Sequence, residues 1–358
     1  MLEVKTILVI NPGSTSTKIG IYENEKEAFR INIEHTTGEL APFKTVAEQY
    51  DFRKNAILNA LRENGFSVET LDCIVARGGA LPPLKGGAYL INAAMADRLK
   101  NRAKVEHASN VAALIAFELA EALNIPSYIY DAISTDELTD IARISGMPVL
   151  PRDSMFHALN SRAVARKVAA SRQRTYADMN LIVAHLGGGI SISIHHLGRV
   201  IDILSDDEGP FSPERAGRVS CGCLIDLCYS GQYDYHTMRK MLRGKGGLLA
   251  CLGTSSGIEV EGRINNGDAE ARLVYEAMAY QIAKGIGELA TVLCGNIDAI
   301  ILTGGLAHSK MLTGWITERV KFIAPVELVP GENELESLAL GGLRVLRGEE
   351  AAHEYDLD

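Results

Sequence analysis

No apolar run in this chain of 358 residues reaches the roughly 18 residues that a membrane-spanning helix needs. The stretch near the start, residues 6–10, is also far too short for the hydrophobic part of a secretion signal. Positive charge is in the minority, because 36 Lys and Arg face 45 Asp and Glu, which gives a net charge of −9. That sign disfavours a protein that binds polyphosphate nucleic acid. We therefore expect a cytoplasmic protein that acts on small ligands, with no nucleic acid and no membrane among its partners.

The chain has only six cysteines, too few for its length to indicate a disulfide framework. Cys73 and Cys294 lie in apolar runs and are predicted to be buried thiols. A further group of potential metal ligands lies in one segment, namely Cys221, Cys223, Cys228 and His236. Their spacing, C-x-C-x4-C-x7-H, matches no common zinc site. Buried thiols, or thiols at a helix start, are therefore the better interpretation.

The length of the chain favours two domains, since a domain averages about 150 residues. Hydrophobic periodicity predicts the same order of strands and helices, βββαβαβ, twice. In the first copy the strands fall at residues 6–10, 18–22, 29–33, 72–76 and 127–130, and the helices at 51–64 and 110–123. In the second copy the strands fall at residues 181–185, 191–195, 200–204, 299–303 and 326–329, and the helices at 269–293 and 311–320.

The two copies align on the junctions where their first strands end, at Asn11 and at His185. These junctions lie about half a chain length apart, which favours a duplicated α/β domain over a solenoid of short repeats. We predict a first domain of residues 1–135 together with a C-terminal helical segment, residues 336–358, and a second domain of residues 136–335.

The second copy carries an insertion, residues 205–268, between its third strand and its long helix. The insertion is rich in Gly, Pro and charge, and it holds Arg215, Arg218 and Arg263. A long polar insertion in a compact domain is usually functional.

A turn rich in small polar residues joins the first two predicted strands, from Asn11 to Lys18. Small residues let the backbone approach an anion, hydroxyls and amides supply donors, and Lys18 supplies charge. No helix follows the turn, so it is not the G-x-x-x-x-G-K-[ST] loop, which occurs nowhere in the chain. An ordinary hairpin is the alternative. The matching junction in the second copy favours a phosphate loop, because three glycines, Gly187 to Gly189, end a buried strand there.

A third glycine junction, Gly304-Gly305, follows the apolar strand at residues 299–303. Ligands of α/β sheets bind at such carboxyl ends of strands. The segment from Gly285 to Ala290 has the glycine spacing of a dinucleotide fingerprint. It falls inside a helical pattern with no strand before it, which disfavours an NAD site.

Five motifs occur in a specific order and spacing: VINPGSTSTK from Val9, VARGG from Val75, MFH from Met155, AHLGGG from Ala184 and LTGG from Leu302. Together they resemble the short-chain carboxylate kinases of the acetate kinase family, and most of all the butyrate and branched-chain fatty acid kinases. That family belongs to a superfamily with sugar kinases, actin and chaperone ATPases. The resemblance runs to about Arg347. It implies duplicated ribonuclease H-like (actin-like ATPase) domains with a nucleotide cleft between them.

The resemblance implies roles for individual residues. It assigns phosphate and nucleotide binding to Asn11, Ser14, Ser16, Lys18, His185, Gly187, Gly188, Gly189, Gly304 and Gly305. It assigns catalysis to Arg77, Asp131, His157 and Arg218, and magnesium binding to Asp131 and Glu334. It assigns contacts with the acid to Ala76, His107 and Phe156.

One departure from the family pattern concerns Arg77. Acetate kinases place an active-site arginine earlier in the same strand, where this chain has Ile74. The role of Arg77 therefore depends on its charge and its closeness to the glycines that follow it. At the neighbouring position, Ala76 stands where acetate kinases tend to carry the larger valine. A smaller side chain would leave room for a longer acyl chain, with Phe156 on the opposite wall.

The implied reaction is the reversible phosphorylation of butyrate by ATP, with Mg²⁺, to butyryl phosphate and ADP. A carboxylic acid is ionised at neutral pH and needs no general base, whereas two anions that approach each other need positive charge around them. Isobutyrate, isovalerate, acetate and propionate are the alternative acids. A homodimer or larger homo-oligomer is also implied.

Two other functions are compatible with the sequence. A sugar kinase of the same fold would attack through a neutral hydroxyl and would require a base, usually an aspartate. A nucleotide-dependent regulatory protein, similar to actin or to a chaperone ATPase domain, would keep the phosphate loops and lack paired arginines.

Overall fold

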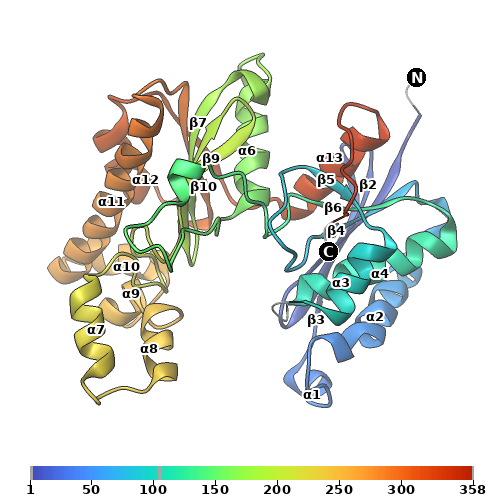
Figure 1. The fold of residues 1–358 in the computed structure, drawn as a ribbon, viewed down its shortest axis with the longest axis horizontal. Coiled ribbons are helices and arrows are strands. Elements are labelled where there is room, and N and C mark those ends of the chain that lie inside the picture. The colour runs from blue at the N-terminus through green and yellow to red at the C-terminus, as the bar shows by residue number, and fades with distance from the viewer. Residues whose placement is uncertain (1–2, 104–106, 357–358) are drawn as a thin grey trace. The chain divides into compact units, whose positions relative to one another are not determined.

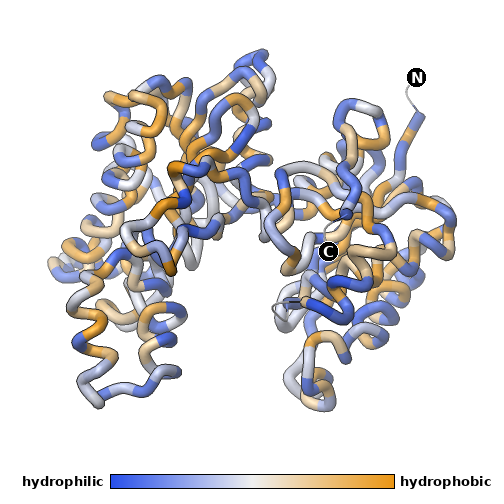
Figure 2. Tube along the Cα trace, viewed as in Figure 1, coloured by the Kyte–Doolittle hydropathy of each residue, from blue (hydrophilic) through white to orange (hydrophobic). Residues whose placement is uncertain are grey.

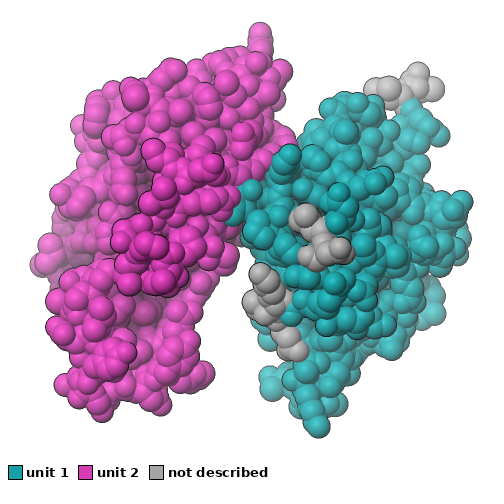
Figure 3. Space-filling view, in the orientation of Figure 1, with its two compact units in different colours: residues 1–136, 333–358 teal, residues 137–332 magenta. Residues whose placement is uncertain are grey.

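The computed structural model describes residues 3–103 and 107–356, and the chain divides into two compact units. Unit 1 takes the chain up to Asp136 together with residues 333–358, and unit 2 takes Glu137–Glu332 (Figure 3). Each unit contains one β-sheet with helices packed against it (Figure 1). Apolar residues follow the strands of both sheets (Figure 2), and each sheet contributes to a separate hydrophobic core.

The sheet of unit 1 has the strand order β3-β2-β1-β4-β6-β5. Its strands are β1 (Thr6–Pro12), β2 (Ser16–Glu23), β3 (Lys26–Glu34), β4 (Cys73–Arg77), β5 (Ala88–Leu90) and β6 (Ser127–Tyr130). Strands β1, β2 and β3 are antiparallel neighbours, whereas β1, β4 and β6 run parallel. The parallel set brings three carboxyl ends to one edge of the sheet, where α/β proteins bind ligands.

Helices cover both faces of this sheet. The helices of unit 1 are α1 (Thr37–Leu40), α2 (Tyr50–Glu63), α3 (Ala93–Asn101), α4 (Ala108–Leu123) and α13 (Glu334–Leu346). Helix α4 packs on the face that carries Ile10 and Ala76, while α13 packs on the opposite face. Helix α13 lies very close to the sheet, because a Cβ at Gly341 or Gly342 would come within 2.5 Å of the Tyr130 ring or of Val75. Only glycine permits this approach.

The sheet of unit 2 has the order β11-β10-β7-β8-β9. Its strands are β7 (Asn180–Leu186), β8 (Ile190–His196), β9 (Arg199–Leu204), β10 (Ala299–Gly304) and β11 (Val326–Pro330). Strands β7, β8 and β9 are antiparallel, and β7, β10 and β11 are parallel, which repeats the arrangement of β1, β2, β3, β4 and β6 in unit 1. The predicted duplication of a βββαβαβ α/β fold is therefore confirmed.

The helices of unit 2 are α5 (Asp140–Arg143), α6 (Ala158–Ser171), α7 (Cys221–Tyr229), α8 (Tyr235–Leu242), α9 (Gly247–Leu252), α10 (Gly257–Asn265), α11 (Ala269–Ala290) and α12 (Lys310–Val320). Helix α11 buries Tyr275, Met278, Ile282 and Ile286, whose spacing of three and four residues forms one face. Its predicted end was three residues too late, because Thr291–Leu293 form a 3₁₀ turn.

The insertion at residues 205–268 is not a structureless loop. It contains the four short helices α7 to α10, each followed by a glycine with positive φ, at Gly231, Gly244, Gly253 and Gly267. Strand β5 and helices α3 and α6 were also not predicted from the sequence. Within the described part of the chain, no helix is long and apolar enough to cross a membrane.

The cysteine predictions have a mixed outcome. Cys73 is buried in β4, and burial raises the pKa of its thiol to about 12. Cys221 begins α7, as expected of a helix-start thiol, and it is exposed. The prediction for Cys294 was wrong, because this residue leaves the helical region with φ +53° and is exposed. Among the described residues, no group of three or more His, Cys, Asp or Glu side chains is arranged to hold a metal ion.

His195 is a fully buried titratable residue in β8. Its Nδ1 lies 2.7 Å from the Tyr176 hydroxyl, and its Nε2 lies 2.9 Å from Ser193 Oγ. Burial, reinforced by the charges of Arg162 and Arg166, holds the pKa of His195 well below its usual range. In the unfolded chain this ring takes up a proton near pH 6.5, whereas in the folded chain it stays neutral.

We therefore expect the free energy of unfolding of unit 2 to fall as the pH drops below 6.5, by up to ~1.4 kcal/mol per pH unit from His195 alone. His195→Gln should flatten this dependence. Tyr176→Phe, which keeps the titrating ring, should lower stability without flattening it. Urea unfolding followed by circular dichroism from pH 7.5 to 5.5 measures both, and an unchanged slope in His195→Gln would contradict the assignment.

Candidate active site

Three of the predicted site residues of unit 1 lie at neighbouring carboxyl ends of parallel strands. Asn11 is near the end of β1, Arg77 ends β4, and Asp131 follows β6 directly. The register pairs Ile10 with Ala76 and Arg77 with Tyr130, so the three side chains belong to adjacent positions along the edge. This edge is where a parallel α/β sheet presents its ligand-binding groups.

Glu334, the first residue of α13, connects two of these strand ends. Asn11 Nδ2 donates a hydrogen bond to Glu334 Oε2 over 2.6 Å, and the Arg77 guanidinium forms an ion pair with Oε1. The Arg77 and Glu334 side chains are each 23% exposed, so solvent screens the pair only in part. The predicted residues Asn11, Arg77 and Glu334 are therefore brought together.

Asp131 has a backbone conformation that is rare for a residue with a side chain, with φ +40°. Its amide donates to Gly87 O over 3.1 Å, and its Oδ1 accepts from Gly87 N over 2.8 Å. The residue is 3% exposed. The surrounding structure thus fixes a carboxylate in a strained conformation at the strand edge, a feature that is common at functional sites.

The carboxylates Asp131 and Glu334 fit the donor chemistry that Mg²⁺ prefers. Mg²⁺ takes hard oxygen ligands and usually binds one or two carboxylates together with water and phosphate oxygens. Such a site does not need a cluster of three protein ligands.

His107 caps the N-terminus of α4, and its Nδ1 accepts a hydrogen bond from Ser109 N over 3.1 Å. Burial lowers the pKa of His107, and the charge of Arg77 lowers it further. The ring is therefore neutral at pH 7, and its proton is on Nε2 because Nδ1 is an acceptor. Ala76, which was also predicted to contact the acid, is fully buried in the core of unit 1 with Ile10 and Ile129. A contact between Ala76 and the acid remains a prediction.

The predicted phosphate turn lies between β1 and β2. Gly13 N donates to Ser16 O over 2.9 Å, which closes the turn. Ser14 and Lys18 are exposed, and Ser16 is half-buried. Lys18 is the cross-strand partner of Asn11, so its charge lies on the strand beside the site edge.

In unit 2, a residue outside the predicted set links two strand ends. Asn160, at the start of α6, has its Nδ2 3.0 Å from His185 Nδ1 and 3.1 Å from Thr303 Oγ1. His185 belongs to β7, and Thr303 comes directly before the Gly304-Gly305 junction. The available sequence signal was the position of Asn160, three residues after His157 at a helix start.

Gly304 is required by its geometry. It has φ +88°, and a Cβ there would lie 2.5 Å from Leu186 O. Gly304 and Gly331 also exchange backbone hydrogen bonds at 3.2 and 3.0 Å. By contrast, nothing lies within 4 Å of a Cβ placed on Gly305, which is exposed. The junction therefore leaves open backbone beside the strand edge.

The rings of His157 and His185 are stacked, with centroids 3.8 Å apart and planes at 10°. Ser191 Oγ lies 2.8 Å from His157 Nδ1, and Glu332 lies 2.9 Å from His185 Nε2. These contacts fix the orientation of both rings. Phe156 instead packs on the small apolar cluster that contains Val200 and Ile203, so its contact with an acid remains a prediction.

The start of the insertion folds over the glycine loop Gly187–Gly189. Ser212 Oγ donates to Gly188 O over 2.6 Å, and Glu214 N donates to the same oxygen over 3.2 Å. Arg215 follows, and its Nε donates to Asp206 over 3.2 Å. Asp206 in turn lies next to Gly189, where an added Cβ would be 3.0 Å from its Oδ2. Arg215 is thereby held beside the loop.

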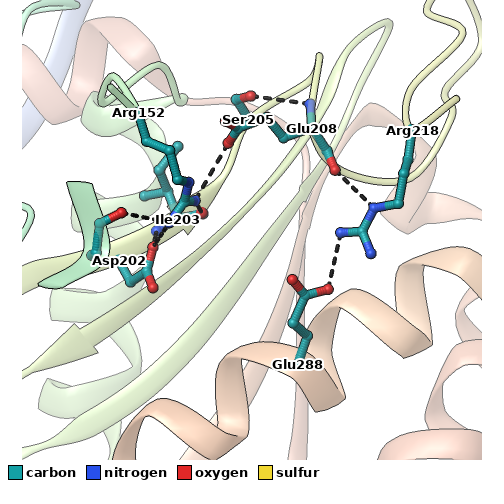
Figure 4. Close-up of polar contacts among 8 residues, drawn as sticks. Arg152, Asp202, Ile203, Ser205, Glu208, Arg218 and Glu288 are labelled. Atoms are coloured by element: carbon teal, nitrogen blue, oxygen red, sulfur yellow. Dashed lines mark hydrogen bonds and ion pairs between the residues drawn. The ribbon is translucent and has the colours of Figure 1, made fainter. Parts of the chain in front are cut away.

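The structure does not bring Arg218 to this loop. Figure 4 shows its Nε donating to Glu208 O and its terminal nitrogen reaching Glu288 on α11, over 3.0 and 2.9 Å. The side chain is 51% exposed and lines a pocket of about 510 Å³ together with Arg152. Arg215 and Arg218 both belong to the insertion, and the family resemblance assigned catalysis to Arg218. The catalytic role of Arg218 remains a prediction, and Arg215 is the arginine that lies beside the glycines.

Residues 149–325, just under half of the chain, match the model of the acetokinase family. The match covers His157, the glycine loop and the insertion.

Solved structures share the fold over almost the whole chain. An acetate kinase from Porphyromonas gingivalis superposes with a TM-score of 0.77 at 20% identity, covering 96% of this chain and 100% of that one. A propionate kinase from Francisella tularensis gives 0.73 at 18% identity, with 94% and 98% covered. A ROK hexokinase from Thermus thermophilus gives 0.51 at 13% identity, with 96% and 99% covered. At these identities the likeness shows the fold.

Asn160→Leu, which roughly keeps the side-chain volume, should lower the free energy of unfolding of unit 2 by about 1–3 kcal/mol. The reason is that His185 Nδ1 and Thr303 Oγ1 are buried and would each lose a partner. Asn265→Leu, at an exposed position on α10, serves as the control and should change stability by less than about 0.5 kcal/mol. Equal urea midpoints for both variants would show that Asn160 does not link the strand ends.

Proposed function

We propose that this chain is a carboxylate kinase of the acetokinase family, which transfers the γ-phosphate of ATP reversibly to a short-chain fatty acid, with butyrate as the preferred acid. The observation that carries the proposal is the acetokinase match over residues 149–325. The higher TM-scores with the acetate and propionate kinases than with the hexokinase support it. A homo-oligomer remains a prediction.

The reaction needs no proton transfer. One carboxylate oxygen of the acid forms a bond to the γ-phosphorus while the bond from that phosphorus to the β,γ-bridging oxygen breaks, and ADP keeps the electron pair. The acid is already ionised at pH 7. Catalysis must therefore offset the repulsion between two anions and stabilise charge on the transferring group.

The residues of unit 1 supply charge and donors for this purpose. Arg77 is oriented by Glu334 and would attract the carboxylate or a phosphate oxygen. Neutral His107 would donate a hydrogen bond through Nε2–H and would not transfer its proton to the substrate. Mg²⁺, held by Asp131 and Glu334, would neutralise charge on the nucleotide phosphates when bound.

The residues of unit 2 would bind the nucleotide. Open backbone at Gly305 allows close approach of a phosphate or of the adenosine, and the loop Gly187–Gly189 lacks side chains that would keep a phosphate away. His157, stacked on His185, would direct its Nε2 toward the transferred group. Arg215, fixed by Asp206, is the arginine that we assign to the transition state on geometric grounds.

The acid itself is tested by substrate series. We expect acyl hydroxamate to form from ATP, Mg²⁺ and hydroxylamine with straight and branched C2 to C6 acids, with the highest kcat/KM for a C4 or C5 acid. Each methylene that enters an apolar site contributes about 0.8 kcal/mol, so butyrate should exceed acetate by roughly fifteen-fold. A higher kcat/KM for glycerol or a hexose would contradict a carboxylate kinase, and acid-independent ATP turnover would favour a regulatory ATPase.

Arg215→Ala should lower kcat by about 10²–10³-fold, because a donor to a transition-state oxygen contributes roughly 2.7–4 kcal/mol. Arg218→Ala is the matched variant in the same insertion and should retain most of the activity, since its side chain bonds to Glu208 and Glu288. Circular dichroism establishes that both variants fold. If Arg218→Ala folds and loses more activity than Arg215→Ala, catalysis belongs to Arg218, as the family resemblance implies.

A further inference from the structure

Arg53 is a buried arginine on α2 that lies beneath the turn between β1 and β2. Its side chain is almost completely covered, with 1% of the residue exposed. Nη2 donates to Ser14 O over 2.8 Å, and Nη1 donates to Ser16 O over 2.9 Å. The planar guanidinium therefore holds two carbonyl oxygens of one turn at the same time.

The carbonyls and the amides of this turn differ in their hydrogen bonding. The carbonyl of Thr15, between the two that Arg53 holds, accepts from His35 N over 2.8 Å. All three carbonyls of residues 14–16 thus have donors inside the unit. The amides of Ser14 and Thr15 donate to no acceptor among the described residues. Successive free N–H groups of a turn form a concave site for an anion.

The charge of Arg53 is not balanced by a carboxylate among the described residues. Its other acceptors are Gln49 Oε1, at 2.9 Å, and Thr17 Oγ1, at 3.0 Å. All four acceptors are neutral. Burial of an unpaired charge is costly, and an anion bound at the turn would supply the missing opposite charge.

A second buried side chain completes the arrangement. His35 Nε2 lies 2.8 Å from Thr17 Oγ1, the hydroxyl that accepts from Arg53. Burial lowers the pKa of His35, and the charge of Arg53 lowers it further. Neutral His35 can accept the Thr17 proton, so Thr17 Oγ1 remains directed as an acceptor toward Arg53.

We propose that Arg53 is a positioning residue for anion binding: its guanidinium holds the turn at residues 13–16 so that the Ser14 and Thr15 amides face a bound phosphate. The identification of that phosphate as part of a nucleotide rests on the proposed function. Arg53 itself touches neither substrate nor the reacting atoms, because the turn lies between.

The test compares the binding of MgADP with the binding of adenosine, which lacks phosphates, by titration calorimetry. Arg53→Met removes the charge, and Arg53→Lys keeps it but cannot span two carbonyls. Both variants should bind MgADP at least tenfold more weakly and adenosine with unchanged affinity. Arg62→Met, at an exposed position on the same helix, should bind both as the unaltered protein does.

Two results with the variants would overturn the proposal. The first is an affinity for MgADP within twofold of the unaltered protein in either Arg53→Met or Arg53→Lys. The second is an equal loss of affinity for MgADP and for adenosine, which would indicate a merely structural role. Hydrogen exchange in the unaltered protein needs no variant. MgADP should slow exchange at Ser14 and Thr15, and binding without such protection would contradict the proposal. A protein that binds no MgADP at all would instead refute the proposed function.

Discussion

The ion pair between Arg77 and Glu334 joins segments that are 257 positions apart in the chain. It requires β4 to end beside β1, and it requires α13 to begin at the same edge of the sheet. The second condition depends on Gly341 and Gly342, because any larger residue would lift the helix from Tyr130 and Val75. The charges of the site are therefore set by close packing about two turns away, on a helix that contributes only its first residue to the site.

The two units have the same strand order and supply different chemistry. Unit 1 contributes carboxylates, an arginine and a turn with free amides. Unit 2 contributes stacked imidazole rings and, at Gly305, backbone that a ligand can approach closely. The shared topology explains the similarity, since both units place their polar groups at the carboxyl ends of parallel strands. The differences arise in the loops, and above all in the insertion, for which unit 1 has no counterpart.

Strands with strong local signals could be predicted from the sequence. The run Ser127–Tyr130 is bounded by Pro126 and Asp131, and its limits were predicted as observed. The helices of the insertion were not predicted, because each has only six to nine residues, fewer than the roughly 11–18 residues over which helical periodicity becomes clear. The site was predictable where motifs end strands. Arg53 and Asn160 were not assigned, since their importance lies in partners distant in the sequence, and the family resemblance pointed to Arg218 and not to Arg215.

The discontinuity of unit 1 has a consequence for biosynthesis. Unit 2 is one continuous stretch, Glu137–Glu332, and the ribosome has synthesised all of it before α13 is made. Until then the sheet face around Val75 and Tyr130 has no cover, and Arg77 has no carboxylate. Domains commonly fold as units during translation, starting from the N-terminus. In this chain the order is reversed, because unit 1 begins first but cannot complete its fold until α13 has been made. Its exposed apolar face is the surface on which a chaperone could act during synthesis.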